Sequence, residues 1–155
     1  MYSVRGDAER KAPNGQKSKL TSFQWAQVRT KAFKEWFGDW EAVAKATPLR
    51  KAATFAEAKK QAEEYIGTPI KNIDTGIIAT VSKTNIEKMF SNSAVNKSTN
   101  AQDHALAVAN ADQLFQHAYL DETHPDKNNE PTIVAIHRFV SPMITTQGNV
   151  IAVKM

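Results

Sequence analysis

The stretch TIVAIHRFV, Thr132–Val140, has the clearest strand pattern in the sequence. It is rich in β-branched and aromatic residues, which suit a pleated and half-buried surface. Because side chains alternate along a strand, His137 and Arg138 project from opposite faces, and His137 shares its face with Phe139. If one face is core, only one of these two polar side chains can point into a given cleft.

A second strand is expected after this one, at residues 149–154. Pro142 is expected to interrupt the first strand, because proline lacks the N–H that a strand ladder needs. A turn at Gln147 and Gly148 then reverses the chain, so the two strands are predicted to form a hairpin.

A long helix is expected before the first strand. Thr99 and Gln102 can cap its amino-terminal end, and the helical pattern continues to about Leu120. Residues 121–131, which include Pro125, are expected to form a polar loop between this helix and the strand.

Shorter elements are expected between residues 48 and 100. Thr54 followed by Glu57 resembles a capping box, which would begin a helix that runs to about Ile66. The other elements expected here are a strand at 76–82, a short helix at 85–90 and a polar loop at 91–100. The pattern predicts an α+β fold with a helical arm at its amino-terminal end, in which a small antiparallel sheet packs against one long helix and short helices.

The front of the chain differs in composition from the rest. Residues 1–19 favour turns and disorder, and are expected to form a flexible lead-in. Residues 20–66 hold all three tryptophans and are expected to form a helical, aromatic-rich module that breaks near Thr30 and Gly38. Residues 67–155 are expected to form the α+β domain. The aromatic side chains are expected to clamp the module to this domain, and a stacking platform for bases is the alternative.

Charge is distributed unevenly along the 155 residues. Residues 1–60 carry 13 Lys or Arg and 6 Asp or Glu, a net charge of +7. Residues 61–155 carry 7 basic and 10 acidic residues, a net charge of −3, and include all four histidines. The basic footprint expected of a phosphate-binding surface therefore lies in the front of the chain.

The composition excludes several kinds of site. The chain has no cysteine, so disulfides, thiolate zinc sites and cysteine nucleophiles are excluded. The HExxH, EF-hand and Gly-rich nucleotide motifs are missing, so no metal and no cofactor are expected. No apolar run approaches the roughly 20 residues of a membrane span, and the polar start lacks a signal-peptide core, so a soluble protein without membrane contact is expected.

Several blocks resemble families found in large polyvalent proteins of phages and conjugative elements. QWAQVRTKAFKEWFGDWE, at 24–41, is similar to a module that tends to stand just ahead of an effector-like domain. Later blocks resemble the large polyvalent protein-associated domain of type three. These blocks are NIDTGIIATVSKTNIEKM at 72–89, HALAVANADQLF at 104–115, ETHPDK at 122–127 and AIHRFVSPM at 135–143.

The resemblance implies that residues 67–155 form an effector-like domain of a phage or mobile element. A more distant analogy connects the fold with metal-independent ribonucleases of the barnase, EndoU, colicin and RelE type. Family members continue past the position of Val153 and Lys154 into further strand-like sequence. We therefore expect a smaller sheet here, in which one wall of an active site would be missing.

Metal-independent RNA cleavage needs a base for the ribose 2′ hydroxyl, an acid for the leaving oxygen and a cation for the developing charge. The catalytic candidates are His104, His137, Arg138 and Lys97, and the substrate-binding candidates are Lys88 and Ser98. Four of them have a structural alternative: a buried His137 hydrogen-bonded beside Phe139, a surface position for Lys97 and Lys88, and a helix cap for Ser98.

The other two histidines fit this scheme less well. His104 and His117 are thirteen residues apart, which places them roughly 140° apart around one helix. His117 is expected at the end of the helix, where a protonated imidazole suits the dipole. His124, in the polar loop, is expected to be solvated.

Two functions agree with these patterns. The first is an effector-type domain that acts as a metal-independent ribonuclease in the bacterial cytoplasm, with RNA as substrate and an immunity protein as a candidate partner. The second is a noncatalytic module that binds a host or phage protein, or a nucleic acid, through its basic aromatic front. The histidine-rich blocks favour the first function, and the acidic second half favours the second.

Overall fold

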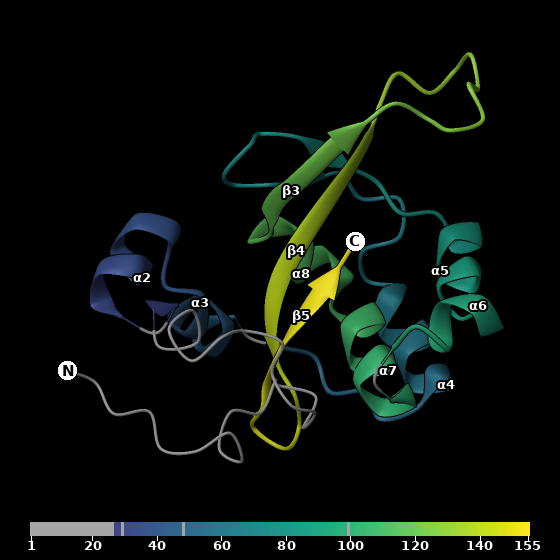
Figure 1. The fold of residues 1–155 in the computed structure, drawn as a ribbon. Helices are drawn as coiled ribbons and strands as arrows, with labels where there is room; N and C mark the ends of the chain where they lie inside the picture. The colour runs from purple at the N-terminus through teal and green to yellow at the C-terminus, as the bar shows by residue number, and fades with distance from the viewer. Residues whose placement is uncertain (1–26, 29, 48, 99) are drawn as a thin grey trace.

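The computed structural model describes residues 27–28, 30–47, 49–98 and 100–155 (Figure 1). The helices are α2 (Lys31–Phe37), α3 (Trp40–Ala46), α4 (Phe55–Ala62), α5 (Lys83–Met89), α6 (Asn92–Val95), α7 (Ala101–Ala109) and α8 (Ala111–Gln116). The strands are β1 (Ile70–Lys71), β2 (Ile78–Ala79), β3 (Tyr119–His124), β4 (Ile136–Ile144) and β5 (Val150–Lys154). The lead-in expected at 1–19, the part of the helical module expected at 20–26 and the cap expected at Thr99 lie outside the described residues.

A three-stranded antiparallel sheet in the order β3-β4-β5 lies at the centre of the fold, and β1 and β2 form a separate ribbon. Within the hairpin of β4 and β5, Val140 pairs with Lys154 and Ile144 with Val150. The predicted α+β class and the predicted hairpin are therefore confirmed.

The two faces of this sheet meet different helices, and Figure 1 shows α3 on one side of β4 and α7 on the other. On the face toward α7 and α8, which we call the inner face, Met143 packs with Leu106 and Leu114, and Phe139 packs with Phe115. The opposite face, toward α3, carries Val140 and Pro142 and is called the outer face. Because each face has its own covering, alternate residues of β4 have separate roles.

The expected single long helix is wrong, because the chain breaks at Asn110 into α7 and α8. The buried Asn110 side chain accepts from the Arg50 N–H at 2.6 Å, and donates to the carbonyls of Arg50 (2.9 Å) and Leu106 (2.8 Å). This residue leaves the helical conformation, with φ at −122°. At the other end of α7, Asn100 is the capping residue, and its side chain accepts from the Asp103 N–H.

Arg50 adds an ionic connection at the same place. Its guanidinium donates to both carboxylate oxygens of Asp112, at 2.7 and 2.8 Å, and to Glu64 at 2.8 Å. Hydrogen bonding to Asp112 is the main cause that raises the pKa of Arg50 above its usual value. The segment before α4 is thereby held against the joint of α7 and α8 by a paired, partly buried charge.

Two predictions about the strands are also wrong. Residues 119–124 form β3 where a loop was expected at 121–131, because they pair with the exposed beginning of β4, where polar side chains remain in water. Pro142 does not interrupt β4, which pairs it with Ala152. Phe139 exchanges backbone hydrogen bonds with Met155, so its N–H points toward β5, and the nitrogen of Pro142, three residues later, points toward the β3 side of β4. Pairing with β3 has already ended at Val140, so no hydrogen bond to β3 is lost at Pro142.

The shorter elements agree in part with expectation. Thr54 and Glu57 form the predicted capping box of α4, and α5 lies where a short helix was predicted. The strand at 76–82 is limited to the two residues of β2, and α6 lies in the expected loop at 91–100. β4 begins at Ile136 instead of Thr132, because its pairing with β3 ends at His124.

Candidate functional site

Three chemically complementary side chains meet where β3 pairs with β4. The register places Glu122 opposite Arg138, and His124 two residues further along β3. Arg138 Nε lies 3.0 Å from Glu122 Oε1 and donates to His124 Nε2 at 3.1 Å. The Glu122 and Arg138 side chains are each 52% exposed. We call these three residues the Arg138 cluster; it holds an exposed acid, an exposed cation and a partly buried imidazole.

The hydrogen bonds define the proton on His124. The Pro125 carbonyl can only accept, so Nδ1, at 2.9 Å from it, carries the hydrogen. Nε2 accepts the Arg138 N–H and therefore has no proton in this state. His124 ends β3, and the prediction that it lies in a loop is wrong.

His137 and Arg138 lie on opposite faces of the two-stranded β3–β4 ribbon, as strand alternation predicted. Its Nδ1 lies 2.8 Å from the Thr123 hydroxyl, and the side chain is exposed. The alternative of a buried His137 is therefore wrong. His137 and Arg138 are neighbours in sequence but cannot act on one bound group.

His104 has a different setting, on the first turns of α7. Nε2 donates to the Met89 carbonyl at 2.6 Å, and Nδ1 lies 2.6 Å from Ser98 Oγ. The ring packs edge-on against Phe55 and Phe90, with ring centres 6.1 and 5.8 Å away. Both nitrogens are thus engaged, and His104 joins α7 to the end of α5 and to the segment before α7.

The structure does not bring His104 to His137 or Arg138. Leu106 of α7 shares a core cluster with Met143 of β4, and His137 lies six residues before Met143. At 3.2–3.4 Å per residue, this separation is about 20 Å along the strand. The pairing of a helix histidine with a strand histidine in one cleft is therefore not present.

The remaining candidates are spread over the molecule. Ser98 contacts His104, whereas Lys97, beside it, and Lys88, on α5, are exposed. His117 is the exposed residue that ends α8, which confirms its predicted place at a helix end. Groups of three or more metal-ligating side chains were not found in the described parts of the chain.

Glu122 was missed by the sequence reasoning, although a signal for it exists. Glu122 and His124 have strand spacing, and Glu122 lies opposite Arg138, but the pattern is recognisable only once residues 119–124 are taken as a strand. Pro125 and the polar composition pointed to a loop instead.

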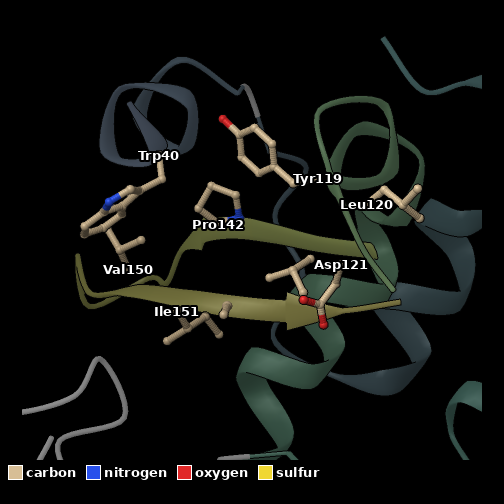
Figure 2. A pocket seen from close by; sticks show the side chains of 9 residues that line it. Trp40, Tyr119, Leu120, Asp121, Pro142, Val150 and Ile151 are labelled. Carbon is tan, nitrogen blue, oxygen red and sulfur yellow. The ribbon is translucent and has the colours of Figure 1, made fainter. Parts of the chain in front are cut away.

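A pocket of about 500 Å³ lies on the outer face, next to the Arg138 cluster. Figure 2 shows Trp40 of α3 at one end, Leu120 and Asp121 toward the other, and Tyr119 and Pro142 between them. The rest of its lining is apolar and includes Val140, Val150 and Ala152. We call it the outer-face pocket; Asp121 is the one charged residue in its described lining.

Gly38, between α2 and α3, fixes how the helices approach this pocket. Its φ of 109° is rare for other residues, and a Cβ at this position would lie 2.7 Å from the Tyr119 hydroxyl oxygen. The turn of the WFGDW block therefore packs directly on β3.

These features define a small α+β domain whose sheet has one helix-covered face and one partly open face. The chain belongs to the family of large polyvalent protein-associated domain 3, whose sequence pattern matches residues 50–155. The matched part holds the Arg138 cluster, and Trp40 lies before it. No curated protein and no solved structure matches the chain. Among the described residues, no helix is long and apolar enough to cross a membrane.

Proposed function

We propose that this domain binds RNA at the Arg138 cluster and cleaves it without a metal ion. The supporting observation is the position of Arg138 Nε, 3.0 Å from Glu122 Oε1 and 3.1 Å from His124 Nε2 on an exposed strand face. When the RNA's own 2′ hydroxyl attacks the phosphate, the reaction needs a base, an acid and a cation. A carboxylate, an imidazole and a guanidinium can supply these three roles.

In the proposed reaction, Glu122 takes the proton of the 2′ hydroxyl, and the 2′ oxygen attacks the adjacent phosphorus. Once the Arg138 N–H has left it, His124 Nε2 binds a proton from solvent, and it gives this proton to the departing 5′ oxygen as the bond from phosphorus to that oxygen breaks. The products are a 2′,3′-cyclic phosphate and a free 5′ hydroxyl. Arg138 stabilises the negative charge on the phosphorane oxygens. Its N–H must first move from His124 to the phosphate, because Nε2 accepts it in the described state.

Of the catalytic candidates suggested by the sequence, Arg138 is retained in this proposal, and Glu122 and His124 are added to it. His137 would act from the opposite face only if RNA wrapped around the ribbon. The contacts of His104 with Met89 and Ser98 favour a positioning role for it. Lys88 and Lys97 are proposed as phosphate contacts outside the cluster.

Binding without cleavage is the second candidate function. Residues 61–155 have a net charge of −3, which opposes tight binding of a polyanion. In that case the same surface would recognise a host or phage protein, or a nucleic acid, without chemistry.

The test is incubation of the purified protein with a single-stranded RNA in EDTA, beside the same oligonucleotide with 2′-deoxyribose throughout. We expect fragments that end in 2′,3′-cyclic phosphate from the RNA, and an intact deoxy strand. Arg138→Ala and Glu122→Gln should each lower the cleavage rate at least 100-fold, in the range of lost acid–base or charge stabilisation. RNA that is bound but stays intact at high protein concentration would favour the second candidate instead.

A further inference from the structure

The outer-face pocket and the Arg138 cluster lie on the same face of the sheet. Arg138, Val140 and Pro142 are each two residues apart on β4, so their side chains project in one direction. Val140 and Pro142 line the pocket. The distance along the strand from Val140 to Arg138 is about 7 Å. A ligand that fills the pocket can therefore continue to the guanidinium.

The lining of the pocket suits a flat ring that carries hydrogen-bond donors. Trp40 and Tyr119 supply aromatic rings, and Pro142, Val150 and Ala152 supply an apolar surface. Bases of single-stranded RNA are bound by such stacking surfaces. Asp121 lies at the end of the pocket away from Trp40 (Figure 2).

Asp121 limits which base fits. An ionised carboxylate offers only acceptors, two oxygens side by side. Guanine presents two adjacent donors on its Watson–Crick edge, whereas adenine, cytosine and uracil each pair a donor there with an acceptor. Asp121 is the extra residue at the irregularity between Leu120 and Glu122, which changes its direction relative to regular strand alternation.

We infer that the outer-face pocket binds the base of an RNA nucleotide, guanine by preference, whose 3′ phosphate then lies at the Arg138 cluster. This inference rests on the proposed function, because that proposal assigns this sheet face to RNA. It adds a base-specific subsite, built jointly by the amino-terminal helices and the family domain. Cleavage would then follow guanosine.

The test is isothermal titration calorimetry of the whole chain with the 3′-monophosphates of guanosine, adenosine, cytidine and uridine. We expect guanosine 3′-monophosphate to bind at least tenfold more tightly than the other three, as a matched pair of hydrogen bonds predicts. Asp121→Asn should remove the preference, because the amide offers one acceptor and one donor group. Ala152→Trp should fill the pocket and abolish binding of all four nucleotides.

Glu130→Gln is the matched control, because it removes an exposed carboxylate outside the pocket lining. It should leave both affinity and preference unchanged. Equal affinity for the four nucleotides, no binding at millimolar concentration, or an Asp121→Asn variant that keeps the preference would overturn the inference.

These measurements separate the inference from the proposed function. Guanine-selective binding that Asp121→Asn removes, in a protein that cleaves no RNA, supports the pocket and contradicts the chemistry. RNA cleavage without base preference, unchanged by Asp121→Asn, supports the chemistry and contradicts the pocket.

Discussion

Two buried asparagines connect parts of the chain that lie far apart in sequence. The Asn72 side chain donates to the carbonyls of Phe115 and Ala118, each at 2.8 Å, and so holds the β1–β2 ribbon to the end of α8. Asn110 does the same for Arg50 and the end of α7. A buried amide that satisfies several backbone groups is costly to remove, because those groups lose their partners without regaining water.

Substitution of Asn110 tests this role. Asn110→Ala should lower the free energy of unfolding by about 3 kcal/mol, because it leaves backbone groups of Arg50 unpaired. Chemical denaturation measures the change. Asn96→Ala, at an exposed position after α6, should change the same quantity by less than about 0.5 kcal/mol. Equal losses in the two variants would show that the Asn110 network adds little.

Gly38 gives a second prediction at the scale of one residue. Gly38→Ala should lower the free energy of unfolding by about 2 kcal/mol or more, because it adds backbone strain and a clash with Tyr119. Gly148→Ala is the matched control: this glycine also has positive φ, but nothing lies within 4 Å of the added Cβ. The difference between the two variants measures the contact with Tyr119, and no difference would show that the α2–α3 turn does not pack there.

At the scale of elements, the position of α7 depends on His104. The imidazole forms hydrogen bonds with Met89 and Ser98 and packs edge-on against both Phe55 and Phe90, so it connects α7 with α4, α5 and the segment before α7. A histidine with both nitrogens engaged in this way is placed to hold structure, although the sequence alone marked it as a catalytic candidate.

Stability measurements distinguish these two roles of His104. His104→Ala should lower the free energy of unfolding by about 2 kcal/mol, and Ser98→Ala by about 1 kcal/mol, from lost hydrogen bonds and packing. His117→Ala, at an exposed helix end, should change it by less than about 0.5 kcal/mol. If His104→Ala leaves stability unchanged but abolishes RNA cleavage, His104 is a catalytic residue and its structural assignment is wrong.

The elements also show what local sequence can predict. The capping box of α4, the short α5 and the β4–β5 hairpin were predictable because caps and turns depend on neighbouring residues. The break at Asn110 and the strand β3 were not, because each depends on a distant partner: Arg50 for the break and the exposed start of β4 for the strand. The Arg138 cluster was missed for the same reason, since its members meet only through that strand pairing.

At the scale of the whole molecule, the site is built across two parts of the chain. The Arg138 cluster lies within the family match at 50–155, whereas Trp40, before it, forms one end of the outer-face pocket. The α2 and α3 helices therefore meet the matched domain on the outer face of the sheet. The amino-terminal helices therefore belong to the proposed RNA surface and not only to the stability of the domain.

The central claim is that chemistry occurs on the outer face of the β3–β4 ribbon, and two histidines of that ribbon test it. His124 and His137 lie on opposite faces, and each makes one side-chain contact with a neighbouring residue of the ribbon. The decisive measurement is the rate of RNA cleavage in EDTA by His124→Ala and by His137→Ala, with folding checked by circular dichroism. We predict a loss of at least 100-fold for His124→Ala and less than about threefold for His137→Ala, since general acid catalysis is worth about 10²–10⁴ in rate. Full activity of His124→Ala, or a larger loss in His137→Ala, would contradict the account.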